Sequence, residues 1–154
     1  MDSNNGNIYV ADTYNHVIRL INTGTGMVST IAGAPGTPGY LNGPAYFESD
    51  PAFSAEFRGP NGIALDSNNG NIYVADTGNS AIRLINTTTG IVSTIAGNGS
   101  SGYLNGPVSS AKFYYPYGIA LDSSNGNIYV ADSYNGVIRL INITSALSKT
   151  ILSF

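Results

Sequence analysis

The chain of 154 residues contains no cysteine and a single histidine, His16. Without cysteine it can form no disulfide, no thiolate metal site and no cysteine nucleophile. One imidazole cannot supply a zinc site with several histidine ligands, nor a histidine-based catalytic centre repeated along one chain. These absences exclude several common classes of enzyme and metal site.

Charged side chains are also scarce, with 6 basic against 9 acidic residues and a formal net charge of −3. A nucleic-acid-binding protein normally carries a basic patch that neutralises phosphates. Three of the cations, Arg19, Arg83 and Arg139, stand at the same position of a repeat, which is typical of a structural role. We therefore predict no nucleic-acid partner.

Long apolar runs are missing as well. No stretch approaches the roughly 18 apolar residues of a membrane span, and the polar start does not resemble a signal segment. This predicts a soluble chain without a membrane partner. The compartment stays open, because the sequons at Asn86, Asn98 and Asn142 would be glycosylated only in the secretory pathway and leave an extracellular location open.

The chain does contain an internal repeat. Residues 2–12 and 66–76 both read Asp-Ser-Asn-Asn-Gly-Asn-Ile-Tyr-Val-Ala-Asp, and residues 122–132 differ from them only at Ser124. Such self-similarity indicates a solenoid, a propeller or another repeat array. Each copy must then be interpreted as one unit of a larger assembly.

The middle copy predicts four short strands. Segments 62–66, 71–76, 81–86 and 91–96 are rich in β-branched residues, and turn sequences such as Ser-Asn-Asn-Gly separate them. Consecutive strands with short turns form an antiparallel meander, and no segment shows helical periodicity. Because one such sheet cannot bury both faces alone, we predict an all-β fold in which the sheets pack radially as blades of a β-propeller.

The patterns Gly-Ile-Ala-Leu-Asp, Asn-Ile-Tyr-Val-Ala-Asp, Ile-Arg-Leu-Ile and Ser-Thr-Ile-Ala-Gly resemble the NHL repeat. The resemblance covers residues 7–31, 62–97 and 118–151. It implies a β-propeller of four-stranded antiparallel blades, with about three blades in this chain as part of a six-bladed ring. The family includes RNA-binding and protein-binding propellers and a lyase domain, so the resemblance selects no single activity.

Blade 1 is expected at residues 1–33 without its inner strand, blade 2 at 59–97 and blade 3 at 115–154. Long inter-blade loops are expected at 34–58 and 98–114. A partial propeller leaves two apolar blade faces open, which a longer chain or a second copy related by a two-fold axis could cover. We favour the longer chain.

Function is expected on the end of the blades that carries the second-to-third strand turns and the inter-blade loops, because long loops on a rigid scaffold concentrate binding residues. The predicted binding residues are Tyr14, His16, Tyr40, Asn42, Tyr103, Asn105 and Tyr134. An alternative, which we favour for two of them, is that Tyr40 and Tyr103 with Leu41 and Leu104 fill the gaps between blades.

The repeated carboxylates Asp12, Asp76 and Asp132 allow a calcium site as an alternative, since calcium takes six to eight oxygen ligands. We favour a structural role in which each caps the backbone amides of its own turn. The repeated arginines are expected to pair with these aspartates or to extend along the blade. No catalytic residue and no required cofactor are predicted.

Three functions follow from these observations. The leading one is a non-enzymatic binding or assembly scaffold that captures a protein or glycan partner on the inter-blade loop face. The second is a fragment of a metal-dependent propeller lyase or hydrolase. The third is a structural subunit whose open blade edges build a homo-oligomer or filament.

Overall fold

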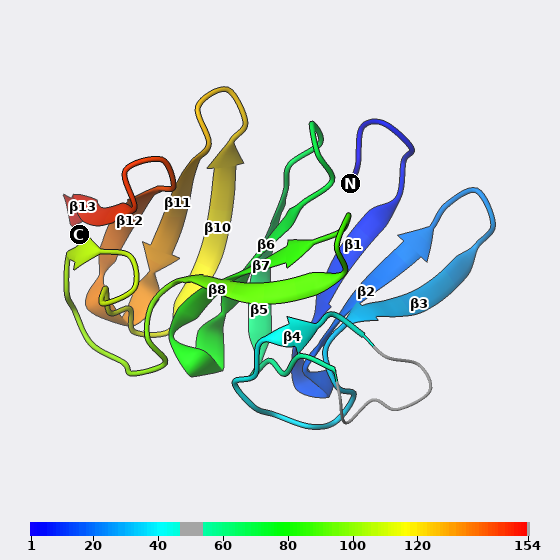
Figure 1. Cartoon of the computed structure of the whole chain (residues 1–154), viewed down its shortest axis with the longest axis horizontal. Coiled ribbons are helices and arrows are strands. Elements are labelled where there is room, and N and C mark those ends of the chain that lie inside the picture. The colour runs from blue at the N-terminus through cyan, green and yellow to red at the C-terminus, as the bar shows by residue number, and fades with distance from the viewer. Residues whose placement is uncertain (47–53, 154) are drawn as a thin grey trace.

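The computed structural model describes residues 1–46 and 54–153 and shows three antiparallel sheets side by side as blades of a propeller (Figure 1). The first sheet has the order β1-β2-β3, the second β4-β8-β7-β6-β5 and the third β10-β11-β12-β13-β9. The first sheet comprises β1 (Ile8–Asp12), β2 (Val17–Asn22) and β3 (Met27–Ala32). The second comprises β4 (Gly43–Pro44), β5 (Pro60–Leu65), β6 (Ile72–Asp76), β7 (Ala81–Asn86) and β8 (Ile91–Ala96). The third comprises β9 (Gly106–Pro107), β10 (Pro116–Asp122), β11 (Asn127–Asp132), β12 (Val137–Asn142) and β13 (Leu147–Ser153).

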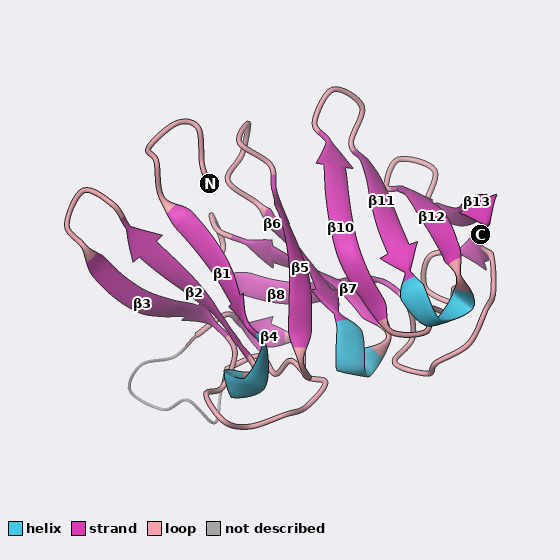
Figure 2. Cartoon of the chain, turned by 180° about the vertical axis from the view of Figure 1, so that it is seen from behind, coloured by secondary structure: helices cyan, strands magenta, loops and turns pink. Residues whose placement is uncertain are grey.

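Short 3-10 helices connect β1 to β2, β6 to β7 and β11 to β12. They are η1 (Thr13–Asn15), η3 (Thr77–Asn79) and η4 (Ser133–Asn135). Figure 2 shows all three along one end of the molecule, whereas the hairpin turns at residues 66–71 and 122–127 project from the other end. We call the end with the 3-10 helices the loop end. Within the described residues, no helix has the length and apolar character needed to cross a membrane.

The segments expected to be inter-blade loops contain strands. Gly43 and Pro44 in β4 pair with the edge strand β8, and β9 pairs in the same way with β13. Each connection thus adds a fifth strand to the outer edge of the blade that follows it. A two-residue Gly-Pro strand gives no alternating pattern, and proline is tolerated there because an edge strand needs fewer ladder donors. Residues 47–53 of the predicted loop 34–58 lie outside the described part of the chain.

Alternation along the strands builds one apolar core between each pair of blades. Ile72 and Val74 of β6 face the first blade, while Tyr73 and Ala75 face the third. The connections contribute Phe57 to one core and Phe113 to the other, and both are fully buried. The favoured expectation for Tyr40 and Tyr103 was therefore wrong: these rings remain 41% and 54% exposed. Phenylalanine fills the gaps because its ring has no hydroxyl that burial would leave unpaired.

The inner strands β5 and β10 approach each other closely at a glycine. A Cβ atom on Gly62 would collide with the carbonyl oxygen of Tyr117 and lie 3.0 Å from the amide nitrogen of Ile119. The equivalent glycine of the third blade is less crowded, since a Cβ on Gly118 would meet only the Cβ of Ala131 at 3.5 Å. The two glycines occupy equivalent positions and differ in crowding, so the same substitution at both tests the close approach of the inner strands.

We expect Gly62→Ala to lower the free energy of unfolding by about 1–3 kcal/mol, because the added methyl group would push two backbones apart. Gly118→Ala should change it by less than about 0.5 kcal/mol. Urea unfolding followed by circular dichroism measures both. Equal effects of the two substitutions would contradict this packing of the inner strands.

Candidate functional site

A buried ion pair lies at the loop end of the second blade. Arg83 of β7 donates from Nη1 to Asp76 Oδ2 over 2.8 Å, and neither side chain is exposed. The third blade repeats the arrangement, with 2.9 Å between Arg139 Nη1 and Asp132 Oδ2. The expected pairing of these arginines with aspartates is thus confirmed.

The ion pair also holds the connection that leads into its own blade. Arg83 donates to the backbone carbonyls of Leu41 and Glu56, over 2.7 and 3.0 Å, and its guanidinium lies over the rings of both Tyr40 and Phe57. Arg139 donates to the carbonyls of Leu104 and Lys112, and its guanidinium lies over the rings of both Tyr103 and Phe113. Cations over aromatic faces are attracted to the ring quadrupole. We call this arrangement of arginine, aspartate and two rings the arginine clamp.

The aspartate completes the clamp from the other side. Asp76 accepts a hydrogen bond from the Arg58 amide at 2.8 Å and one from the Asn79 side chain at 2.9 Å. Asp132 likewise accepts from the Tyr114 amide and the Asn135 side chain. The predicted capping of backbone amides within the aspartate's own turn was wrong, since the turns have no such side-chain bond. Each aspartate instead accepts from the side chain of an asparagine in the turn and from a backbone amide of the connection.

Hydrogen bonds already occupy two of the carboxylates that the calcium alternative would use. Both oxygens of Asp76 accept hydrogen bonds, and so do both oxygens of Asp132. Across residues 1–46 and 54–153, no three His, Cys, Asp or Glu side chains lie close enough to hold one ion. Burial raises the pKa of the Asp76 carboxyl, while hydrogen bonds from Asn79, the Arg58 amide and Arg83 act in the opposite direction. These bonds offset part of the cost of a buried charge, and the pKa of Asp76 stays above its ordinary value.

Four of the predicted binding residues lie on the connections that the clamps hold. Tyr40 and Tyr103 lie against the guanidinium groups. Asn42 Oδ1 accepts from Arg83 Nη2 at 2.8 Å, and Asn105 lies 3.4 Å from the hydroxyl of Thr150. Tyr103 shares a hydrogen bond of 2.7 Å with the same hydroxyl. Each of the four therefore helps to anchor a connection on the outer part of its blade.

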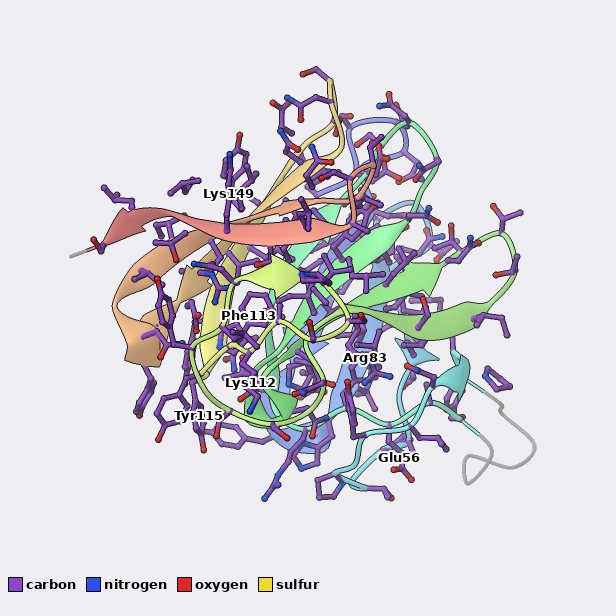
Figure 3. All side chains as sticks on the ribbon, turned by 60° about the vertical axis from the view of Figure 1, so that its left-hand side comes forward. Glu56, Arg83, Lys112, Phe113, Tyr115 and Lys149 are labelled. Atoms are coloured by element: carbon purple, nitrogen blue, oxygen red, sulfur yellow. The ribbon has the colours of Figure 1, made fainter. Side chains whose placement is uncertain are left out.

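The other predicted residues lie at the loop end. Tyr14 on η1 is 93% exposed, and Tyr134 on η4 is 65% exposed. The ring of Tyr134 lies 5.2 Å from that of Tyr114 and 4.8 Å from that of Tyr115. Figure 3 shows Tyr115 at this end of the molecule. Tyr14, Tyr114, Tyr115, Tyr117 and Tyr134 together form what we call the aromatic face.

A pocket of about 340 Å³ opens on the aromatic face. Tyr14, Tyr115 and Tyr117 line it together with His16 and Arg58. Polar groups between the blades form a chain within its lining: Asn61 Nδ2 donates to Thr77 Oγ1 over 3.0 Å, and Thr77 Oγ1 donates to the Pro116 carbonyl. His16 Nδ1 accepts from the Gly59 amide at 3.1 Å. Groups from all three blades thus build one site.

Sequence reasoning missed Tyr114, Tyr115 and Tyr117. The signal was a difference between copies, since Tyr-Tyr-Pro-Tyr at 114–117 stands where the second blade has Arg-Gly-Pro-Asn at 58–61. Tyr115 adopts φ 51° at the position where Gly59 has φ 56°. An aromatic residue in this left-handed region is strained, and such residues concentrate at functional sites.

Comparison with known proteins places the chain among propeller repeats. The NHL repeat family model matches residues 57–83 and 113–139. Protein SUPPRESSOR OF QUENCHING 1, chloroplastic, of Arabidopsis thaliana is 33% identical over 147 residues, which are 94% of this chain and 14% of that protein. NHL repeat-containing protein 2 of Gallus gallus is 28% identical over 142 residues, which are 91% of this chain and 19% of that protein. The chain therefore spans less than a fifth of either relative.

A similar solved structure is a protein of unknown function from Bacteroides thetaiotaomicron. It superposes with a TM-score of 0.74 at 27% sequence identity. The superposition covers 87% of this chain and 32% of the other one. The blades described above thus correspond to about a third of that chain.

The clamp predicts a large difference between two aspartates. Asp76→Ala would leave Arg83 buried without its counterion, so we expect it to lower the free energy of unfolding by about 3–5 kcal/mol. In the first blade Asp12 lies 3.8 Å from Arg19, and both side chains are about one third exposed. Asp12→Ala should therefore cost less than about 1 kcal/mol. Denaturant unfolding measures both; similar losses would show that the buried clamp contributes no more than a surface pair.

Proposed function

Since the chain is part of an NHL-repeat β-propeller, we propose that it is a non-enzymatic binding module whose partner docks on the aromatic face. The observation that carries the proposal is the group of exposed tyrosine rings gathered over one pocket. Large rings with a polar tip provide contact area at low entropic cost and are enriched in recognition surfaces. The clamps support this role by fixing the segments that carry the rings.

We favour a protein over a glycan as the partner. The face draws on the third blade and the 3-10 helix of the first, and it surrounds a pocket that Arg58 also lines. Hot spots in protein interfaces are typically tyrosine, tryptophan and arginine in such settings. The alternative of a metal-dependent lyase or hydrolase gains no support from the described residues, in which Asp76 and Asp12 at this end are engaged by arginine and asparagine.

Binding can be tested with an immobilised glycan panel and a displayed peptide library. We expect selected peptides to bind at least about tenfold more weakly to a Tyr115→Gly, Tyr134→Ala variant, a loss typical of removing interface hot spots. Glycine at 115 keeps the left-handed backbone that Gly59 adopts in the other blade.

The matched control replaces two exposed apolar residues at the opposite end by alanine: Met27 at the start of β3 and Ile143 on the turn after β12. Peptides that lose affinity for the control as much as for the tyrosine variant would contradict the proposed face. If the chain binds glycans of the panel and no peptide of the library, the partner is a carbohydrate and not a protein.

Self-association is a second candidate, because the chain exposes both halves of its own inter-blade interface. Ile8 and Val10 of β1 are 37% and 36% exposed, whereas their counterparts Ile72 and Val74 are fully buried. On the third blade a pocket of about 280 Å³ lies over Tyr129 and Ala131, whose counterparts in the second blade are buried. A second copy could cover both faces. Solution mass decides this, since a stable monomer excludes self-association.

A further inference from the structure

The pocket on the aromatic face carries a free cation. The Arg58 side chain is exposed and makes no hydrogen bond or ion pair within residues 1–46 and 54–153. The nearby carboxylates are directed elsewhere: Asp76 binds Arg83, and Asp12 binds Asn15. Glu56 reaches to Gly39, on the connection held by the clamp. A positive group without a counterion in a chain of net charge −3 favours a negatively charged ligand.

Backbone contacts hold Arg58 in place. Its amide donates to Asp76 at 2.8 Å, and its carbonyl accepts from the Gly78 amide at 2.8 Å. Its side-chain stem lies over Gly78, where a Cβ atom would come within 2.8 Å of Arg58 Cγ. The backbone and stem of Arg58 are therefore fixed in the pocket lining, while its guanidinium has no partner among the described residues.

His16 supplies a second donor. Because its Nδ1 accepts the Gly59 amide proton, the neutral imidazole carries its own proton on Nε2. This N–H has no hydrogen-bond partner within the described part of the chain. The equivalent residues in the other blades are Ser80 and Gly136, so the imidazole belongs to this pocket alone among the three copies.

The other residues that line the pocket indicate which group the ligand carries beside its negative charge. The polar groups of Asn61 and Thr77 bond to each other and to the Pro116 carbonyl, so they need no ligand. Tyr14, Tyr115 and Tyr117 offer ring surface beside the two donors. Aromatic rings prefer offset-stacked or edge-to-face contact with another ring. The lining thus matches an anion that carries a neighbouring flat apolar group.

We propose that the pocket binds the carboxylate of an acidic residue that is next to an aromatic residue in a peptide segment of the partner. This inference rests on the proposed function and specifies its ligand. A carboxylate fits better than a phosphate, because phosphate groups on proteins typically bind opposite a cluster of arginines, whereas Arg58 is the single arginine lining this pocket. The rings of the aromatic face would contact the neighbouring aromatic side chain.

Amide chemical-shift titration of the ¹⁵N-labelled chain tests this with two matched probes, acetyl-Glu-Phe-amide and acetyl-Gln-Phe-amide. We expect the glutamate probe to bind about tenfold more tightly, the effect of one charge-assisted pair. Arg58→Gln should abolish this preference, and His16→Ser should reduce it. Lys149→Gln removes an exposed cation on β13, away from the pocket, and should leave the preference unchanged.

Equal binding of the two probes, or an unchanged preference in Arg58→Gln, would overturn the inference. If both probes bind equally and shift the amides of Tyr115 and Tyr134, the aromatic face still binds peptides, so the proposed function stands without its acidic ligand. A further probe, 3-phenylpropionate, carries a carboxylate and a ring but no peptide bond, and it tells whether the pocket takes a free organic acid or a peptide. Affinity equal to that of the glutamate probe would identify a free organic acid, and weaker affinity a peptide.

Discussion

The rest of the structure depends on the arginine clamp. Burying an arginine and an aspartate costs several kcal/mol per ion unless the remaining donors and acceptors are satisfied. In the second blade the connection supplies two carbonyls and two rings to Arg83 and an amide to Asp76. Both terminal nitrogens of Arg83 are then paired, and Nε has no partner within the described residues. The ion pair and the connection therefore stabilise each other. In the first blade, where the described residues include no such connection, the corresponding pair is looser at 3.8 Å.

This mutual dependence links the scaffold to the surface that differs between blades. Asp76 and Asp132 accept hydrogen bonds from the amides of Arg58 and Tyr114, the residues at which each connection turns into an inner strand. Equivalent clamps thus present different side chains at equivalent positions. The second blade contributes a cation and the third blade contributes tyrosine rings, so a single asymmetric face arises from nearly symmetric repeats.

Much of the fold could be predicted from the sequence because its information is local and repeated. Turn sequences and β-branched strands in each copy indicate antiparallel blades, and the recurrence of Arg83 and Arg139 indicates a structural ion pair. The fifth strands could not be predicted, because Gly43 and Pro44 form only two ladder pairs and show no alternation. Hydrophobicity alone also could not distinguish Tyr40 from Phe57 as the ring that fills the inter-blade gap.

The site could be predicted only in part, because some of its residues are brought together only in the folded chain. Tyr14, His16 and Tyr134 lie in turns whose position follows from the meander, so their end of the molecule could be assigned. Tyr115 lies at the entry to a strand and there resembles an ordinary strand residue. Its role depends on a left-handed backbone and on ring contacts with Tyr114 and Tyr134, which arise only when the chain is folded.

Native-state amide hydrogen exchange tests the clamp most directly. Arg58 and Tyr114 lie just outside the strands, where amides ordinarily exchange after small local openings. If the clamp holds the connections, both amides should exchange as slowly as those of the neighbouring strands β6 and β11. Exchange of these two amides at the rate of the exposed turns would contradict the account, because the connections would then open independently of the blades.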